Sequence, residues 1–267
     1  MADVTGRIET HRVFDIDIEV ERRGKGAPLV LLYDEEALTR EAPLVDVLAR
    51  SHEVILPSPP GFGRSGRPNW IETVDDVSYV LLDLFDELGI ADATVMGFSL
   101  GGWIAAEMGT KTCAHMARLV LVDPYGIKVG GPFDRDIQDI WYLPADKVLA
   151  LKYADPENGR IDYTQMPDDR LEIVARNRES FARFCWSPYL HNPRLKARLH
   201  RIAVPTLVVW GANDGIVTPD YGKAFAAEIP GARFETIARA GHFPHLEQPD
   251  AFMKLLDDFL AEARSAA

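Results

Sequence analysis

Residues 94–105 read TVMGFSLGGWIA, and this stretch decides the fold. It places Gly97, Ser99 and Gly101 in the order G-x-S-x-G, after a short apolar run and before an apolar helical pattern. A strand that turns sharply into a helix needs glycine on either side of its strained apex, because bulkier side chains would collide with the strand and the helix. Glycine and serine are also ordinary loop residues. The neighbouring segments must therefore decide whether this turn presents Ser99 as a nucleophile.

Strands and helices alternate on both sides of this turn. After two antiparallel strands within residues 7–20, apolar runs predict strands at residues 29–32, 52–56, 93–96, 118–124, 205–210 and 234–237. Helical patterns cover residues 37–49, 73–88, 101–110, 219–228 and 250–262. Strands that alternate with helices at this spacing imply a parallel sheet with right-handed crossovers and helices on both faces. The fold class is therefore α/β.

The alternation stops between residues 125 and 201. This segment is helical and irregular in pattern and is rich in aromatic side chains. The simplest organisation is one core domain in two segments, residues 1–124 and 202–267, with residues 125–201 inserted as a helical cap. The aromatic side chains either line a pocket under this cap or form the core of the cap itself.

Composition excludes several classes of partner. With 29 basic and 41 acidic side chains the net charge is −12, which opposes binding to nucleic acids and to anionic membrane surfaces. The N-terminal residues carry charges throughout, and no apolar run approaches the length of a membrane span, so we expect a cytoplasmic protein. Cys113 and Cys185 are far apart in sequence and fit neither a disulfide framework nor a metal motif. Two free thiols are expected.

A serine nucleophile needs a base within hydrogen-bond reach and a third group that orients the base. In an open parallel sheet these groups lie on loops that follow strands. His242 meets this condition in the loop AGHFP, and Asp214 meets it in GANDG. Asn-Asp-Gly is also a common turn sequence, so Asp214 could be a turn residue only. Asp123, at the end of LVDP, is the alternative candidate for the orienting carboxylate. His245 has no third ligand at metal spacing, so a metal is not expected.

These residues stand within motifs that resemble those of the α/β-hydrolase fold family, in its branch of capped, cofactor-free esterases, carbon–carbon bond hydrolases and haloperoxidase-like enzymes. The motifs are PGFGRSGRP at residues 60–68, GFSLGG at 97–102, VPTLVVWGANDGIV at 204–217 and AGHFPHLEQP at 240–249. The resemblance implies a mostly parallel eight-stranded twisted sheet flanked by helices, with the aromatic insert as a lid over the pocket.

The resemblance also implies a role for each candidate residue. Ser99 is the expected nucleophile, His242 the base and then the acid, and Asp214 the orienting carboxylate. The family's dehalogenases and epoxide hydrolases are disfavoured, because they carry Asp where this chain has Ser99. The expected partner is a small-molecule substrate, and the chain is expected to be a monomer or a homodimer. The candidate lid or substrate contacts are Phe98, Trp141, Phe184, Trp186 and Phe243.

The sequence departs from the family pattern at the loop that should complete the oxyanion site. Two backbone N–H donors are expected for the developing oxyanion, those of Leu100 and Glu35. Family members usually have His-Gly at the start of the second loop, whereas this chain reads Tyr33, Asp34, Glu35 and Glu36. One interpretation is that these acids face solvent or cap the next helix. The other is that Glu35 or Asp34 enters the pocket with a raised pKa, as an acid or as a selector of cationic or polar substrates.

Three functions follow from these residues. The leading hypothesis is hydrolysis of an ester, lactone, amide or carbon–carbon bond in a small to medium substrate, through an acyl-enzyme or a gem-diol. The altered oxyanion loop motivates a second, a lyase or cofactor-free oxygenase on the same scaffold. The third is a ligand-binding signalling protein derived from a hydrolase, which would capture a partner with negligible turnover. The fold alone does not choose among them.

Overall fold

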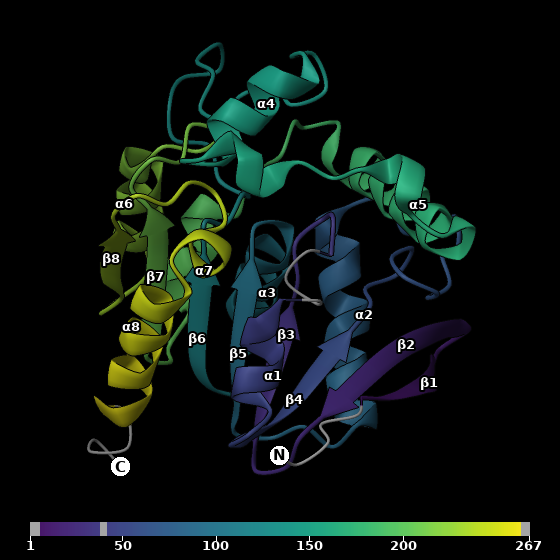
Figure 1. The fold of residues 1–267 in the computed structure, drawn as a ribbon. Helices are drawn as coiled ribbons and strands as arrows, with labels where there is room; N and C mark the ends of the chain where they lie inside the picture. Colours follow the sequence, from purple (N-terminus) through teal and green to yellow (C-terminus); the bar gives the residue numbers. More distant parts are fainter. Residues whose placement is uncertain (1–5, 38–41, 263–267) are drawn as a thin grey trace.

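The computed structural model describes residues 6–37 and 42–262 of the chain. They form an eight-stranded sheet in the order β1-β2-β4-β3-β5-β6-β7-β8, with helices packed against it (Figure 1). The strands are β1 (Arg7–Val13), β2 (Ile16–Arg23), β3 (Ala27–Leu32), β4 (His52–Pro57), β5 (Ala93–Phe98), β6 (Met116–Val122), β7 (Thr206–Gly211) and β8 (Arg233–Ile237). Only the pairs β1–β2 and β2–β4 are antiparallel. The prediction of a mostly parallel α/β sheet is confirmed.

Two hydrophobic cores lie on the two faces of the sheet. Leu29 and Leu31 of β3 belong to one core, and Val30 and Leu32 belong to the other, because successive side chains of a strand point to opposite faces. Strand β3 is therefore apolar without interruption. The helices that pack on the first face are α1 (Pro43–Leu48) and α8 (Pro249–Glu262), and those on the second are α2 (Val74–Glu87), α3 (Leu100–Lys111) and α6 (Pro219–Ala227).

The helix expected at residues 37–49 is shorter in the structure. Helix α1 begins only at Pro43, a residue favoured in the first turn of a helix, and residues 38–41 lie outside the described part of the chain. After β3 the chain makes a turn in which Asp34 accepts hydrogen bonds from the backbone N–H groups of Glu36 and Ala37. This turn, which has no helical period in its hydrophobic pattern, positions the acidic side chains that follow β3.

A long segment between β6 and β7 contains α4 (Ala145–Lys152) and α5 (Asp168–Cys185), with the short 3₁₀ helices η2 (Pro156–Gly159), η3 (Tyr163–Gln165) and η4 (Lys196–Arg201). Figure 1 shows α4 and α5 beyond the carboxyl ends of the strands. Helix α5 is tied to the loop after β4, since Asn177 accepts from the N–H of Gly63 and Ser180 donates to the carbonyl of Gly61. That residues 125–201 act as a separate cap domain stays a prediction.

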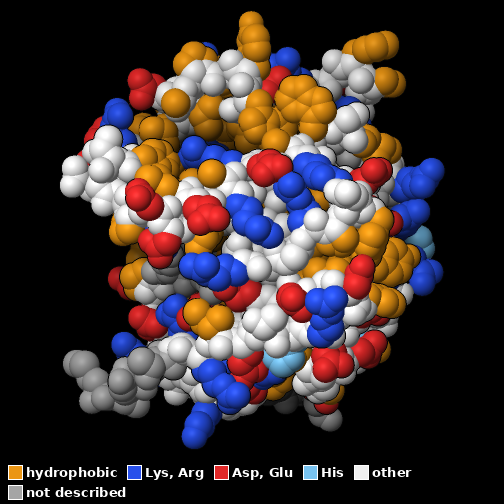
Figure 2. All heavy atoms as spheres, turned by 90° about the vertical axis from the view of Figure 1, so that its right-hand side faces the viewer, with side chains coloured by type: hydrophobic (Ala, Val, Ile, Leu, Met, Phe, Trp, Pro, Cys, Tyr) orange, Lys and Arg blue, Asp and Glu red, His pale blue; other side chains and the backbone are white. Residues whose placement is uncertain are grey.

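The surface fits the composition. Figure 2 shows the face on the α5 side, where basic and acidic side chains are interspersed and hydrophobic side chains gather toward the top. The segment between β6 and β7 exposes Phe133, Tyr142 and Trp186. Within the described residues, no helix is both long enough and apolar enough to cross a membrane.

Candidate active site

Ser99 stands at the turn between β5 and α3, as the sequence predicts. It is the N-cap of α3 and has φ 51° and ψ −114°, a strained backbone for a residue with a side chain. A Cβ on Gly101 would lie 2.1 Å from the carbonyl oxygen of Leu32, and one on Gly97 would lie 2.4 Å from the carbonyl oxygen of Gly101. Glycine at both positions therefore lets strand and helix approach while the Ser99 hydroxyl stays at the apex.

Three loops bring Ser99, His242 and Asp214 together in the order expected. His242 follows β8 and Asp214 follows β7, and all three residues are buried. His242 Nε2 is 2.8 Å from Ser99 Oγ, and His242 Nδ1 is 2.6 Å from Asp214 Oδ2. The other oxygen of Asp214 accepts from the N–H groups of Ile216 and Val217 at 2.8 and 3.1 Å. The carboxylate is thus held so that one oxygen orients the imidazole.

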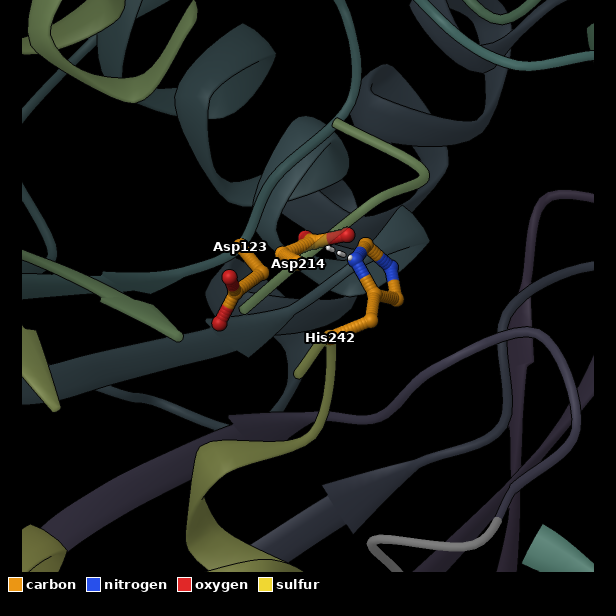
Figure 3. A group of neighbouring side chains, drawn as sticks. All are labelled: Asp123, Asp214 and His242. Atoms are coloured by element: carbon orange, nitrogen blue, oxygen red, sulfur yellow. Dashed lines mark hydrogen bonds and ion pairs between the residues drawn. The ribbon is translucent and has the colours of Figure 1, made fainter. Parts of the chain in front are cut away.

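Asp123, the rival of Asp214, lies in the same group. Figure 3 shows Asp214 between Asp123 and His242, with the hydrogen bond running from His242 to Asp214. Asp123 accepts instead from the N–H of Gly211 at 2.9 Å. Burial raises the pKa of Asp123 well above its ordinary value, and the nearby charge of Asp214 adds to the rise. The raised pKa favours the neutral form of Asp123 beside the carboxylate that orients the base.

Asp123, Asp214 and His242 are also the one group among the described residues whose donor atoms are close enough to hold a metal ion, all within 4.8 Å of one another. His242 Nδ1 already bonds Asp214, so a metal would have to replace the bond that orients the base. His245 is the second residue of α7 (Pro244–Glu247) and packs on Phe98 with ring centroids 4.2 Å apart. Burial lowers the pKa of His245 to about 3, which keeps it neutral.

The acidic loop after β3 reaches the nucleophile. Asp34 and Glu35 are both buried, so the interpretation that these acids face solvent is wrong for both. Ser99 Oγ donates a hydrogen bond to Glu35 Oε2 at 2.8 Å. Lys152 Nζ lies 3.1 Å from Glu35 Oε1 and 3.3 Å from Glu36 Oε1. A carboxylate therefore contacts the serine hydroxyl, and an ammonium group pairs with that carboxylate, which the family pattern does not predict.

The pKa of Glu35 moves opposite to the expectation of a raised value. Burial alone would raise it, but the charges of Lys152 and His242, the backbone N–H of Glu35 itself and the Ser99 hydroxyl together lower it. Burial likewise acts to lower the pKa of Lys152, but the carboxylates of Glu36 and Glu35 raise it well above its usual range. The two side chains therefore form a buried ion pair.

Sequence reasoning missed Lys152 and Tyr125. Lys152 ends α4, is only 4% exposed and accepts at its carbonyl a hydrogen bond from the N–H of His242. Its apolar neighbours in LALKY are the one sequence signal of burial, and they do not identify its partner. Tyr125 is fully buried and stacks on the ring of His242 at 5.1 Å and 24°. Its position after the Asp-Pro of LVDP gives no sign of this contact.

A cavity of about 980 Å³ lies beside the ion pair. Its lining includes Glu35, Glu36 and Lys152 together with apolar and aromatic side chains of the segment between β6 and β7, among them Trp141, Leu149, Tyr153 and Phe181. Ser99 is not part of the lining and is 1% exposed. Because Glu35 contacts both the cavity and the Ser99 hydroxyl, it lies between them.

Of the five candidate lid contacts, only Trp141 lines this cavity. Phe98 belongs to the core beneath the sheet and packs on Phe252. Phe184 packs on Phe62, and Phe243 lies between the rings of His242 and Tyr153. Trp186 is 63% exposed and packs on the outside of Trp141. The other four aromatics do not line this cavity, and their role as lid or substrate contacts stays a prediction.

The two expected oxyanion donors belong to residues next to the nucleophile, since Leu100 follows Ser99 in the chain and Glu35 bonds its hydroxyl. Leu100 is the first residue of α3, where backbone N–H groups have no partner within the helix. The N–H of Glu35 interacts with its own carboxylate. The role of both groups as oxyanion donors stays a prediction.

Comparison with known proteins finds related hydrolases. Residues 33–255 match the model of the alpha/beta hydrolase family. A 2-hydroxy-6-oxo-6-phenylhexa-2,4-dienoate hydrolase of Burkholderia cepacia is 29% identical over 231 residues, which cover 80% of this chain and 79% of that protein. A 2-hydroxymuconate semialdehyde hydrolase of Pseudomonas putida is 26% identical over 263 residues, covering 90% of this chain and 89% of that protein.

Solved structures share the fold. The 2-hydroxy-6-oxo-6-phenylhexa-2,4-dienoate hydrolase of a Rhodococcus strain superposes with a TM-score of 0.74 at 21% identity, over 97% of this chain and 100% of that one. Naproxen esterase of Bacillus subtilis superposes with a TM-score of 0.76 at 19% identity, over 96% and 92% of the two chains. At these identities the likeness concerns the fold alone.

Proposed function

The chain belongs to the alpha/beta hydrolase family, and we propose that it is a serine-dependent hydrolase that cleaves an ester, lactone, amide or carbon–carbon bond of a small to medium organic substrate. The observation that carries the proposal is the hydrogen-bonded series Ser99–His242–Asp214, with distances of 2.8 and 2.6 Å. The relatives named as dienoate and semialdehyde hydrolases support hydrolysis at a carbon next to a carbonyl group. The cavity of about 980 Å³ has room for such a substrate.

The reaction begins with a proton transfer to His242 Nε2. Ser99 Oγ attacks the substrate carbonyl carbon as its proton moves to the imidazole, and Asp214 stabilises the imidazolium that forms. His242 then returns the proton to the leaving oxygen, nitrogen or carbon. A water molecule, deprotonated by His242, hydrolyses the resulting acyl-enzyme and releases the acid. In the gem-diol route water attacks the carbonyl directly, and His242 serves as the same base.

Neighbouring residues support this use of His242. Stacking on Tyr125 holds the imidazole plane, and the hydrogen bond from the N–H of His242 to the carbonyl of Lys152 holds its backbone. The raised pKa of Asp123 favours its neutral form, which limits the build-up of negative charge next to Asp214. We further propose that residues 125–201 act as a lid, since α4 and α5 supply much of the cavity lining. A cytoplasmic location and a monomer or homodimer remain predictions.

The test is the Ser99→Ala variant on a p-nitrophenyl ester. Loss of the nucleophile is expected to lower kcat by about 10⁴-fold or more, since the residues of a triad act as a unit. Ser51→Ala, at an exposed serine outside the site, is the matched control and should keep full activity. Ester turnover that survives Ser99→Ala at an unchanged rate would exclude Ser99 as the nucleophile.

A lyase is the second candidate, and the Glu35 carboxylate beside Ser99 favours it. A negative charge at that point repels an oxyanion, whereas a lyase that removes a hydroxyl proton and expels a carbanion builds no tetrahedral oxyanion on Ser99. Turnover in oxygen-18 water separates the two functions. A hydrolase incorporates the label into its acid product, and a lyase releases unlabelled products.

A further inference from the structure

The Glu35 carboxylate contacts the nucleophile at the loop where the second oxyanion donor is expected. It accepts a hydrogen bond from the Ser99 hydroxyl at 2.8 Å, and the backbone N–H of Glu35 helps to lower its pKa. That N–H is one of the two donors expected to stabilise the tetrahedral intermediate. A carboxylate that takes up the Ser99 hydroxyl and this N–H would have to move before Ser99 attacks an acyl group.

The same contact directs the serine proton away from the base. A hydroxyl group has one proton to donate, and Ser99 Oγ donates it to Glu35 Oε2. His242 Nε2, 2.8 Å from the same oxygen, must then act as the donor in its own bond to Ser99. Attack on a substrate needs the opposite arrangement, in which Ser99 donates to His242. Because Nδ1 also donates to Asp214, the imidazole in this arrangement holds two protons. His242 becomes the base for Ser99 only when Glu35 is displaced and the Nε2 proton passes to solvent.

Glu35 is better suited to be a bound anion than a second base. A general base works best when its pKa is near the working pH, and the pKa of Glu35 is held below its ordinary value despite burial, chiefly by Lys152 and His242. A carboxylate with a lowered pKa is a weak base and removes a proton from serine poorly. It also competes well with other anions for hydrogen-bond donors.

The cavity next to Glu35 has room for the carboxylate once it is displaced from Ser99. Glu35 and Lys152 both line it, and the flexible stem of a lysine lets its ammonium group follow a partner. Two carboxylates, Glu35 and Glu36, then share the single ammonium of Lys152 close to the bound acyl group. The cavity lining has two further basic and two further acidic side chains, so their charges cancel: Arg160, Arg178, Asp162 and Glu179.

Resting on the serine hydrolase function above, we propose that Glu35 is an internal ligand of the oxyanion site, and that its pair with Lys152 selects uncharged or cationic acyl groups over acyl groups that carry a carboxylate. The selection follows from charge. A substrate carboxylate would meet an excess of negative charge beside Ser99, whereas an ammonium group would be attracted by it. Glu35 thereby acts as a specificity-determining residue.

Three p-nitrophenyl esters of one chain length test the proposal: the hexanoate, the 6-aminohexanoate and the half-ester of adipic acid. For the wild-type protein, kcat/KM is expected to be at least about tenfold lower for the anionic ester than for the other two. Glu35→Ala is expected to raise kcat/KM for the hexanoate by about tenfold and to narrow the difference between neutral and anionic esters. Millimolar acetate should become a competitive inhibitor of this variant only, because it can bind in the vacated site.

Glu36→Gln is the matched control. It removes a carboxylate from the same lysine but leaves Glu35 beside Ser99, so it should stay insensitive to acetate. If Glu35→Ala does not fold, as judged by circular dichroism, the isosteric Glu35→Gln takes its place. Its amide still fills the site, so it should lose the discrimination against the anionic ester and remain insensitive to acetate.

Two results would overturn the proposal. If Glu35→Ala loses activity and acetate restores it, Glu35 is a base in the reaction rather than an internal ligand. If neither discrimination nor acetate sensitivity changes in either Glu35 variant, the carboxylate does not occupy the oxyanion site. The underlying function is tested separately, because ester turnover that survives Ser99→Ala contradicts the hydrolase mechanism itself, whatever the charge preference.

Discussion

Replacing Lys152 by Met removes the ammonium group that balances two carboxylates next to the nucleophile. Methionine keeps the length and much of the apolar contact of the lysine stem. The distances from Nζ to the carboxylate oxygens of Glu35 and Glu36 are 3.1 and 3.3 Å. Coulomb's law with an effective dielectric constant of about 20 gives roughly 5 kcal/mol for one such pair. Breaking a buried pair costs about 3–5 kcal/mol in practice, so we expect the free energy of unfolding at pH 8 to fall by about that amount.

The loss of stability in Lys152→Met should increase with pH. In the wild type the pKa of Glu35 lies below its ordinary value, so the stability that this carboxylate contributes is present above its unfolded-state pKa and is lost as the pH falls through the folded-state pKa. In Lys152→Met burial dominates and the pKa of Glu35 rises, so the folded variant binds a proton that the unfolded chain releases near neutral pH. The difference from wild type should therefore be larger at pH 8 than at pH 5.

Urea denaturation at the two pH values measures both effects. Lys147→Met, on the same helix but at an exposed position, is the matched control and should change the free energy of unfolding by less than about 0.5 kcal/mol. A loss below about 1 kcal/mol for Lys152→Met, or a loss that is the same at pH 5 and pH 8, would refute the buried ion pair and its electrostatic account.

Two further predictions concern the turn and the second acid. Gly101→Ala should lower the free energy of unfolding by about 3 kcal/mol or more, because its Cβ would lie 2.1 Å from the backbone oxygen of Leu32. The control is Gly89→Ala, where the added Cβ meets open space at φ 62° and the loss should be only about 1–2 kcal/mol. Equal losses for the two variants in thermal unfolding would contradict the steric account. Asp123→Asn removes a carboxyl group whose folded-state pKa is raised. In the wild type the folded protein holds this proton while the unfolded chain releases it, so the carboxyl group lowers the free energy of unfolding as the pH rises above its unfolded-state pKa. Relative to wild type, this variant should gain stability between pH 4 and pH 8 in urea denaturation, and parallel pH profiles would show that Asp123 is not held neutral.

The sequence was a good guide wherever a short-range rule applies. Glycines flanking Ser99 predict the sharp turn because the collision they avoid involves only the adjoining strand and helix. The alternation of strands and helices predicts the parallel sheet because crossovers of one hand leave few other arrangements. Asp214 and His242 could be selected because loops after parallel strands meet at one edge of the sheet.

The sequence was a poor guide wherever a side chain had to choose among distant partners. The apparent helix at residues 37–49 begins only at Pro43, because hydrogen bonds to Asp34 make a turn first. Four of the five proposed lid aromatics do not line the cavity, since their positions in the chain do not tell which side chains the tertiary structure brings to it. Asp123 and Asp214 follow neighbouring strands, and only the packed structure shows which one bonds His242.

The sequence by itself determined the α/β fold, the nucleophile turn and the order of its partners, because each depends on steric and topological rules that act along the chain. Only the tertiary structure decided the state of the oxyanion site. Glu35 and Lys152 are 117 positions apart, and the direction of the Glu35 pKa depends on whether burial or that distant ammonium prevails. Burial by itself would have made Glu35 a neutral acid, and the fold makes it a charged ligand of Ser99, because electrostatic energy depends on distances in space.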